Sequence, residues 1–531
     1  MAPADPIPWW KGATVYQIYP RSFCDTTGNG QGDLPGILSK LDHIADLGVD
    51  AIWLSPIYPS PNQDWGYDVS DYCDVHPDFG TLADFDTLLD AIHRRGLKLI
   101  LDQVLSHTSD RHPWFVDSLN RGDTSDWYIW ADPKPDGTAP NNWLSDFGGP
   151  AWHYHALRGQ CYHHKFLRTQ PALNFHTAAV RDAALNVLRF WLDRGVDGFR
   201  LDVANSFFHD ATLADNEPVP MQDRTLWHRA MDAHQQRHLH DSNRPEIRGF
   251  HHDIRRLMDG YPDTFVFAEN HEEPDHLQGF YNHTDALHSF YTPEISQHLT
   301  RPQRLAAIQD NYSAMEKSWP CVTMSNHDYL RPASATRLPK EFPADTAHRA
   351  KFFLTLLFAL RGTVLMYQGE ELGLPQTELT QIDQVRDPVG LLNWPLYKGR
   401  DGSRTPIPWS STGAAMGFST ADITWLPMPE THRALAAEQQ QNDQKSPYAW
   451  AQRLIALRKK HPALALGDMT TVEATNDAWI FERSYDGETL RAIFVLQGDH
   501  ILPATADVLV SLSDFDGRRP LVSGDAIIIR A

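Results

Sequence analysis

Cysteine is scarce in this chain, and the few cysteines form no recognisable metal or redox motif. The four of them lie far apart and include no Cys-x-x-Cys pair: Cys24, Cys73, Cys161 and Cys321. Secreted disulfide scaffolds and zinc ribbons place cysteines close together in sequence, whereas isolated cysteines are typical of reduced thiols in the cytoplasm. We therefore expect free thiols and a cytoplasmic location.

Long apolar segments and a surplus of basic residues are also absent. The longest apolar run, around residues 352–360, has the length of a buried helix, and the first ten residues lack the basic head and apolar core of a signal peptide. Lys and Arg total 47 against 68 Asp and Glu, a net charge of −21. This balance disfavours nucleic acid and anionic membrane surfaces as partners and is compatible with a neutral substrate.

The sequence has no nucleotide-binding glycine motif, although one glycine-rich stretch is present. Neither G-x-G-x-x-G nor G-K-[ST] occurs, so no organic cofactor is expected. In the stretch 25–33, oxygen-bearing side chains recur at every second position: Asp25, Thr27, Asn29, Gln31 and Asp33. This pattern favours a loop around a structural Ca²⁺ or Mg²⁺, of modest affinity because only two of the five side chains are carboxylates. The alternative is a turn in which Asp33 caps a helix over 34–47.

Apolar strands alternate with helical segments along most of the chain, which indicates a parallel α/β fold. Eight strands are expected, at residues 13–19, 51–56, 97–104, 198–202, 264–269, 284–290, 321–326 and 363–368. We predict a (β/α)8 barrel over 1–107 and 177–465, an irregular domain inserted after the third strand at 108–176, and a C-terminal antiparallel β-sandwich over 466–531.

The stretch Gly198–Asn205 reads as a buried strand that ends in charge. Phe199 and Leu201 alternate with Arg200 and Asp202, so the two charged side chains point to one face and the apolar pair to the other. A guanidinium two residues before a carboxylate keeps it ionised and oriented, as a nucleophilic aspartate requires. A structural Arg–Asp pair is the alternative at this point.

Polar side chains follow several other predicted strands at the point where each strand stops: Asp102, His107, Glu269, His327 and Asp328. In a (β/α)8 barrel these strand ends share one face, where active sites lie. Three acids from three strands can therefore converge as nucleophile, proton donor and orienting acid. Two carboxyl groups roughly 5–5.5 Å apart perform retaining glycoside hydrolysis, and the anions Asp202 and Asp328 would favour the protonated form of Glu269.

With these residues identified, the chain resembles the α-amylase superfamily, glycoside hydrolase family 13, in its α-glucosidase and oligo-1,6-glucosidase branch. The resemblance extends from Trp9 into the C-terminal domain. Five ordered motifs carry it: Asp102-Gln-Val-Leu-Ser-His107, Gln170-Pro-Ala-Leu-Asn174, Gly198-Phe-Arg-Leu-Asp202, Ala268-Glu269 and Asn326-His-Asp328.

The resemblance implies a role for each residue of the site. Asp202 is implied as nucleophile, Glu269 as general acid/base, and Asp328 as the acid that grips vicinal hydroxyls. The remaining implied substrate-binding residues are His107 and His327 at the transition state, Arg200 beside the nucleophile, Tyr67 stacked on glucose, Asp64 and Arg404 as a charged pair at its far hydroxyls, and Phe147 and Phe166 as pocket walls. Such a pocket releases one glucose from a non-reducing end.

Several positions depart from the family pattern. Ser106 replaces an Asn, which puts the amylase-type calcium in doubt, and Thr27 and Asn29 weaken the first metal loop. Ala172 replaces an acid, and Asn270 follows Glu269 where a small apolar residue is usual. Glu272 and Glu273 are rival proton donors, which we rank below Glu269 because they fall past the strand end.

The expected activity is a retaining, exo-acting α-glucosidase on short α-glucosides. Val203 after the nucleophile resembles α-1,6-specific relatives, whereas the long loop from Phe207 resembles α-1,4-specific ones, and we favour α-1,4 linkages as in maltose. The alternatives are an oligo-1,6-glucosidase, a dedicated α-glucosyl transferase or isomerase, a phosphosugar hydrolase and a non-catalytic relative. The expected partners are a small oligosaccharide with water or an alcohol as acceptor, and the chain is expected as a monomer or homodimer.

Overall fold

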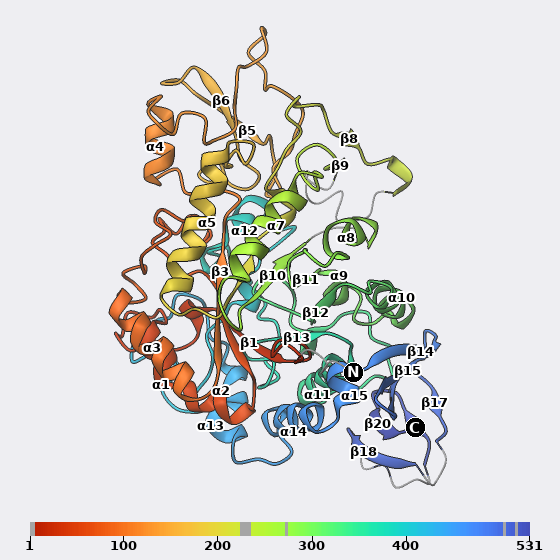
Figure 1. Cartoon of the computed structure of the whole chain (residues 1–531). Helices are drawn as coiled ribbons and strands as arrows, with labels where there is room; N and C mark the ends of the chain where they lie inside the picture. Colours follow the sequence, from red (N-terminus) through yellow and green to blue (C-terminus); the bar gives the residue numbers. More distant parts are fainter. Residues whose placement is uncertain (1–5, 224–234, 271–273, 503–505, 514, 516–518) are drawn as a thin grey trace.

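The computed structural model describes residues 6–531 apart from 224–234, 271–273, 503–505, 514 and 516–518. Eight parallel strands close into a barrel in the order β1-β13-β12-β11-β10-β7-β3-β2 (Figure 1). The strands are β1 Thr14–Ile18, β2 Ala51–Leu54, β3 Lys98–Gln103, β7 Gly198–Leu201, β10 Phe265–Glu269, β11 Ser289–Tyr291, β12 Trp319–Thr323 and β13 Thr363–Tyr367. The predicted (β/α)8 barrel is confirmed.

The sixth strand differs from its predicted range. We expected residues 284–290, but β11 covers only Ser289–Tyr291. Thr284 and Asp285 are exposed in a turn, and Ala286 closes that turn through a hydrogen bond to the carbonyl of His283. The apolar residues that follow, Ala286 and Leu287, are buried although they lie outside the strand. Apolar character therefore did not mark where the strand begins.

Helices surround the barrel on its outside (Figure 1). The helix predicted over 34–47 is divided at Lys40 into two, and Asp33 caps the first of them by accepting from the Gly36 amide. The helices are α1 Leu34–Ser39, α2 Leu41–Leu47, α3 Leu82–Arg94, α5 Ala178–Asp193, α7 Ile247–Met258, α8 Pro274–Tyr281, α9 Glu294–Gln297, α10 Pro302–Ser313, α11 Thr346–Ala359, α12 Pro388–Asn393, α13 Ala437–Gln440, α14 Pro447–Lys460 and α15 Pro462–Leu466.

Large inward-pointing side chains fill the barrel interior. Trp53, Phe265, Phe267 and Trp319 belong to one buried cluster there. Gly198 opens β7 beside this cluster, and a Cβ at that position would lie 2.0 Å from the backbone oxygen of Phe265. Only glycine therefore allows β7 and β10 to pair this closely. Their register determines how the polar residues at the carboxyl ends of the two strands lie relative to each other.

The segment between β3 and α5 forms a small irregular unit above the barrel (Figure 1). It contains α4 Pro113–Leu119 and a three-stranded sheet of β4 Trp130–Ala131, β6 Gln160–His163 and β5 Trp152–His155. Its own buried cluster includes Trp143, Trp152 and Cys161. Two short strands, β8 Glu217–Pro218 and β9 Gln236–Arg237, pair in the long connection after β7.

The C-terminal part of the chain is an antiparallel sheet in the order β14-β15-β16-β20-β18, with a two-stranded ribbon of β17 and β19. The sheet packs on the barrel through Phe494, whose ring lies 5.6 Å from that of Phe352 in α11. The strands are β14 Asp468–Ala474, β15 Ala478–Tyr485, β16 Glu488–Val495, β17 Asp499–His500, β18 Asp507–Ser511, β19 Leu521–Val522 and β20 Ala526–Arg530.

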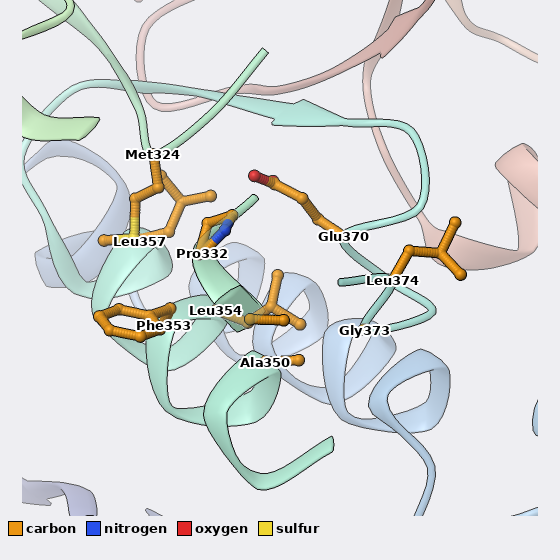
Figure 2. A pocket seen from close by; sticks show the side chains of 10 residues that line it. Met324, Pro332, Ala350, Phe353, Leu354, Leu357, Glu370, Gly373 and Leu374 are labelled. Atoms are coloured by element: carbon orange, nitrogen blue, oxygen red, sulfur yellow. The ribbon is translucent and has the colours of Figure 1, made fainter. Parts of the chain in front are cut away.

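An apolar pocket lies between α11 and the ends of β12 and β13, and it contains one charged side chain. Figure 2 shows Glu370 reaching into this pocket toward Met324 and Pro332. Its carboxyl group accepts hydrogen bonds from the Ser325 hydroxyl at 2.5 Å and the Tyr367 amide at 3.1 Å. Burial raises the pKa of Glu370 to about 7.

All four cysteines are free thiols, and three of them are buried. Throughout the described part of the chain, every helix is too short or too polar to cross a bilayer.

Candidate active site

The carboxyl ends of β3, β7 and β10 meet around one arginine. Arg200 donates from Nη1 to Asp102 at 2.7 Å and to Asp202 at 2.6 Å, and from Nη2 to Glu269 at 2.5 Å. Its Nη2 and Nε also donate to the Tyr291 hydroxyl at 3.0 and 3.3 Å. All five N–H groups of the guanidinium are thereby used, so the two predicted catalytic carboxylates have fixed positions on either side of it.

This cluster is buried, and burial dominates its proton equilibria. Burial raises the pKa of Asp202, while the charge of Arg200 opposes the rise and the neighbouring carboxylates add to it. Asp102 shows the same balance, with its pKa raised to about 6. The pKa of Asp102 therefore lies close to the pH range in which enzymes work, whereas for Asp202 burial favours the protonated form and Arg200 the ionised one.

His327 lies between two tyrosine rings beside this cluster. Its ring stacks on Tyr67 at 5.2 Å and on Tyr19 at 5.5 Å. The amide of Gln17 is 2.9 Å from Nδ1, and the Tyr67 hydroxyl is 2.6 Å from Nε2 and donates to Asp102 at 3.0 Å. Burial lowers the pKa of His327 to about 3, so it is a neutral imidazole, and donation from the Gln17 amide to Nδ1 favours the tautomer with its proton on Nε2.

A second cluster of charges closes the opposite side of the site. Arg404 donates to Asp328 at 2.7 Å, while Arg400 donates to Asp64 at 2.8 Å, to Asp387 at 2.8 Å and to Asp328 at 3.3 Å. The predicted pairing of Asp64 with Arg404 is therefore wrong, because Arg400 occupies that position. Arg404 lies deeper in the protein, where its Nε donates to the carbonyl of His327 at 2.8 Å.

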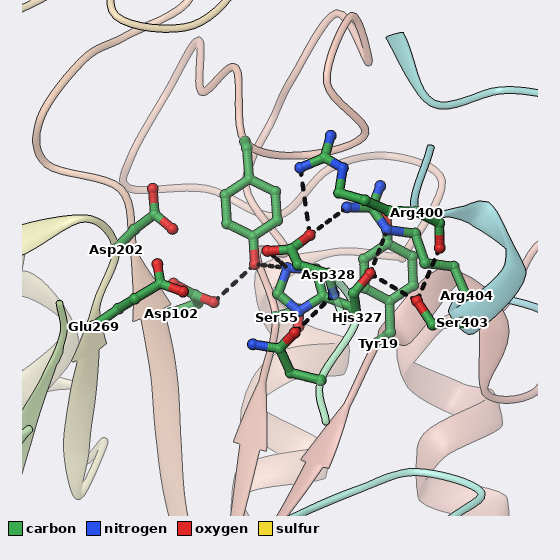
Figure 3. Close-up of polar contacts among 12 residues, drawn as sticks. Tyr19, Ser55, Asp102, Asp202, Glu269, His327, Asp328, Arg400, Ser403 and Arg404 are labelled. Carbon is green, nitrogen blue, oxygen red and sulfur yellow. Dashed lines mark hydrogen bonds and ion pairs between the residues drawn. The ribbon is translucent and has the colours of Figure 1, made fainter. Parts of the chain in front are cut away.

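The two clusters face each other across the site. Figure 3 shows Asp102, Asp202 and Glu269 on one side, Arg400 and Arg404 on the other, and Asp328 between them. Burial opposes ionisation of Asp328, but Arg400 and Arg404 outweigh it and hold the pKa of Asp328 far below its usual value, so that group is an anion. Burial instead raises the pKa of Asp64 to about 6, against the attraction of Arg400.

His107 and two phenylalanines line the side formed by the inserted segment. His107 donates from Nε2 to the carbonyl of Tyr67 at 2.9 Å, and burial lowers its pKa to about 4. The ring of Phe166 lies 5.2 Å from His107 and 5.3 Å from Phe147. The Gln170 amide lies 3.0 Å from Asp64, which connects this wall to the second charge cluster.

The residues that depart from the family pattern have local hydrogen-bonding partners. The Ser106 hydroxyl lies 2.9 Å from Nδ1 of His107, so it orients that ring. Ala172 forms an isolated β-bridge with His107. Asn270 donates from its backbone to the carbonyl of Tyr291 at 3.0 Å and from its side chain to Tyr281 at 3.4 Å, which anchors the backbone directly after Glu269.

The loop 25–33 has its oxygen atoms turned onto protein donors. Asp25 accepts from the amides of Gly28 and Gly30 at 2.9 and 2.7 Å and from the Ser419 hydroxyl at 2.5 Å. Asp33 accepts from Thr26 and caps α1.

The other predicted ligands of this loop are engaged in the same way. Thr27 donates to Asp25, Asn29 accepts from the Gln31 amide, and Gln31 accepts from the guanidinium of Arg21. In this arrangement the residues do not fit a cation, because their acceptors are filled and a positive charge lies beside Gln31. Within the described ranges, no group of three or more His, Cys, Asp or Glu side chains has the geometry of a metal site.

Sequence reasoning missed several residues of the site. Arg400 and Asp387 lie in the irregular excursion after β13, where neither periodicity nor a strand end indicated them. Gln17 lies one residue before the end of β1, and Tyr291 ends β11, one residue beyond the predicted range of the sixth strand. Glu272 and Glu273, the rival donors, lie outside the described residues.

Comparisons with known proteins agree with this geometry. Residues 17–467 match the family model of the α-amylase catalytic domain. A probable α-glucosidase of Rhizobium meliloti is 46% identical over 92% of this chain and 89% of its own length. An oligo-1,6-glucosidase of Parageobacillus thermoglucosidasius is 34% identical over 96% of this chain and 95% of its own length. The crystal structure of an α-glucosyl transfer enzyme, XgtA, superposes with a TM-score of 0.92 at 41% identity, covering 99% of this chain and 100% of that one.

The barrel of eight parallel strands carries the expected acids at the carboxyl ends of β3, β7, β10 and β12, and the family model spans most of the chain. The chain therefore belongs to the α-amylase superfamily, glycoside hydrolase family 13, in its α-glucosidase and oligo-1,6-glucosidase branch.

Proposed function

We propose that this chain is a retaining, exo-acting α-glucosidase that removes one glucose from the non-reducing end of a short α-glucoside. The observation that carries the proposal is the position of Asp202 and Glu269 on the two arms of the Arg200 guanidinium. Two carboxyl groups held by one guanidinium suit attack on an anomeric carbon by one and protonation of the leaving oxygen by the other.

In the first step, an oxygen of Asp202 forms a bond to the anomeric carbon while the bond to the leaving oxygen breaks. Glu269 gives its proton to that oxygen, and the shortened sugar leaves as an alcohol. Arg200 stabilises the Asp202 carboxylate before attack, and its charge remains close when the glucosyl ester has formed. The anion Asp328 lies where it can accept hydrogen bonds from sugar hydroxyls. These hydrogen bonds strengthen as positive charge develops on the sugar ring.

In the second step, the ionised Glu269 takes a proton from water or an alcohol. The oxygen of that acceptor bonds to the anomeric carbon, and the ester bond to Asp202 breaks to restore the carboxylate. Glucose or a new α-glucoside is released with its original configuration. Every acid, base and nucleophile is a side chain of this chain, so the scheme needs no organic cofactor.

The second charge cluster supports removal of a single glucose. Arg400 joins Asp64, Asp328 and Asp387 and so closes the far side of the site. We assign Asp64 and Arg400 to the far hydroxyls of the bound glucose, and the ring of Tyr67 to its apolar face. A charged wall at this position leaves no passage for a chain that extends beyond one sugar ring.

His107 and His327 complete the sugar-binding wall in this proposal. Both are neutral imidazoles at working pH, so they offer hydrogen bonds without adding charge near the developing oxocarbenium ion. Phe147 and Phe166 form the apolar part of the entrance. Arg400 lies over the Phe147 ring at 5.1 Å, which joins this entrance to the closed end of the pocket.

For the linkage we favour α-1,4 bonds in maltose-like disaccharides. The long loop after β7 is fastened to the inserted segment by hydrogen bonds from Asn141 to the Leu213 carbonyl at 3.0 Å and from Trp143 to the Ala214 carbonyl at 2.9 Å. This attachment supports a confined entrance, which would favour short substrates. The alternative is α-1,6 specificity, which Val203 and the similarity to an oligo-1,6-glucosidase support.

A transferase is the second candidate, because the similar structure XgtA is described as an α-glucosyl transfer enzyme. Digestion of maltose and of isomaltose, with and without an added alcohol, separates these candidates. An α-1,4 glucosidase releases two glucoses per maltose. A dedicated transferase gives little free glucose and mainly new glucosides. Cytoplasmic location and a monomeric or dimeric state stay predictions.

Two variants test the catalytic assignments. Asp202→Asn should lower turnover by roughly 10⁴-fold or more while maltose still binds, as measured by calorimetry. Glu269→Gln should lose activity on maltose but keep formation of the glucosyl-enzyme from an aryl α-glucoside, whose leaving group needs little protonation. Asp422→Asn, at an exposed carboxylate, is the matched control. Normal rates in Asp202→Asn would contradict the proposal, and normal maltose turnover in Glu269→Gln would move the acid to Glu272 or Glu273.

A further inference from the structure

Tyr291 is the residue next to the predicted acid/base across the sheet. It ends β11, and in the register of the parallel pair it lies directly opposite Glu269 at the end of β10. Its hydroxyl lies 3.0 Å from Oε1 of Glu269. The side chain is 1% exposed, and its ring packs against Trp53 and Phe267 at 6.2 and 6.1 Å, so it has little freedom to turn away.

The chemistry of the neighbours fixes the direction of the hydrogen bonds at this hydroxyl. Arg200 contacts the oxygen from both Nη2 and Nε, and a guanidinium can only donate. The lone pairs of the Tyr291 oxygen are thereby occupied, and its single proton is directed to Glu269. Burial raises the pKa of Tyr291 well above its ordinary value, so the hydroxyl keeps this proton at every working pH.

The two oxygens of Glu269 therefore have different donors. Oε2 accepts from Arg200 at 2.5 Å and faces the Val203 amide at 3.4 Å, whereas Oε1 accepts from Tyr291. Arg200 also donates to Asp202. Tyr291 therefore accepts from the arginine that holds the nucleophile and donates to Oε1, the oxygen of the acid/base to which Arg200 does not donate. The hydroxyl can stabilise the ionised carboxylate and fix its rotation, but it cannot accept a proton from it.

We propose that Tyr291 is a positioning residue that orients Glu269 and sets how readily it gives up its proton. The inference rests on the proposed function, because it assigns Glu269 to proton transfer. It predicts that loss of the hydroxyl disturbs proton transfer to the leaving group rather than sugar binding or attack by Asp202. Donors to the ionised form of an acid favour ionisation, so their loss makes the acid hold its proton to higher pH.

The test compares two substrates in Tyr291→Phe. For kcat/KM, which reports formation of the glucosyl-enzyme, we expect a fall of about tenfold or more on maltose and a much smaller fall on p-nitrophenyl α-glucoside. The alkaline limb of kcat/KM on maltose should also move to higher pH. An equal fall on both substrates with an unmoved alkaline limb, or unchanged kinetics, would overturn the inference.

A matched control removes a comparable buried hydroxyl without contact to Glu269. Tyr312 shares a hydrogen bond of 2.8 Å with Thr292, just beyond the end of β11. Tyr312→Phe should leave the ratio of the two substrates and the pH profile unchanged. A shift in this variant equal to that in Tyr291→Phe would show a general packing effect and contradict the proposal.

A second perturbation keeps the hydroxyl, so it does not depend on the folding of Tyr291→Phe. Incorporation of 3,5-difluorotyrosine at position 291 strengthens the donor, and the alkaline limb should then move to lower pH, opposite to the phenylalanine variant. A shift to higher pH or no shift would count against the proposal. Turnover of both substrates by the unmodified chain checks the proposed function separately, and its absence would overturn both.

Discussion

Replacing Glu370 by glutamine should stabilise the protein at alkaline pH and have little effect at acidic pH. The carboxyl group lies in an apolar pocket, and burial raises its pKa from 4.5 to about 7 (Figure 2). Glutamine has the same shape and can keep both hydrogen bonds, since its carbonyl accepts from the Tyr367 amide and its NH₂ donates to the Ser325 hydroxyl. The variant removes only the charge.

The size of the effect follows from the pKa difference. Because the folded state prefers the neutral acid, the contribution of Glu370 to stability is fully present below the unfolded pKa near 4.5 and is lost as pH rises through about 7. Each pKa unit corresponds to about 1.4 kcal/mol, so the ionised group costs about 3 kcal/mol at pH 8 and less than about 1 kcal/mol at pH 5. Glu370→Gln should recover this difference.

Urea unfolding followed by tryptophan fluorescence at pH 5 and pH 8 measures the effect. The midpoint of Glu370→Gln should exceed that of the unmodified protein at pH 8 and nearly match it at pH 5. Glu341→Gln, at an exposed glutamate, should change neither midpoint. No gain at pH 8, or an equal gain at both pH values, would refute the reasoning that burial of the charge is what limits stability here.

Two further predictions concern the charge clusters of the site and of the loop after β7. Arg400→Gln removes the cation beside Asp64, so the inhibition constant for glucose should rise by about tenfold or more. The acidic limb of kcat/KM should move to higher pH, because the pKa of Asp64, about 6, rises further without the cation. Unchanged glucose inhibition would contradict the assignment. Asp241→Asn breaks buried contacts of 2.8 Å with His238 and 3.4 Å with Lys165 and should destabilise the fold by about 3–5 kcal/mol at pH 7. These partners outweigh burial and depress the pKa of Asp241 far below its ordinary value, so the stability it contributes is present above the unfolded pKa near 4 and is lost only as pH falls through the much lower folded pKa. Thermal unfolding should therefore show a similar loss at pH 7 and at pH 4, and a loss that has disappeared at pH 4 would contradict the charge assignment.

Much of the barrel could be predicted because strand ends leave a local trace in the sequence. Apolar runs that stop at Asp102, Asp202 and Glu269 indicate strands whose last residues face a shared site, and the structure joins these three through Arg200. The motifs made the family recognisable, and their order along the chain matches the strands on which they lie.

The same local trace was weaker in the sixth strand. The stretch 284–288 mixes apolar and polar residues in a way that suits a strand, yet it forms a turn. The boundary therefore fell one residue before Tyr291, and the partner of Glu269 in the sheet was not seen. Only strand register shows that these two residues face each other.

The sequence by itself determined the fold class, the identity of the carboxylates and their places at strand ends, because each depends on residues near one another in the chain. Only the tertiary structure decided which arginine meets Asp64. Arg400 and Arg404 lie four residues apart in an irregular segment with no periodicity, and Arg404 is turned inward onto the His327 carbonyl while Arg400 faces the site. The same holds for the loop 25–33: its spacing suits a cation, but the folded backbone directs its own amides and the side chain of Arg21 to those oxygens. Long-range contacts of this kind depend on how the whole chain packs, and no local pattern records them.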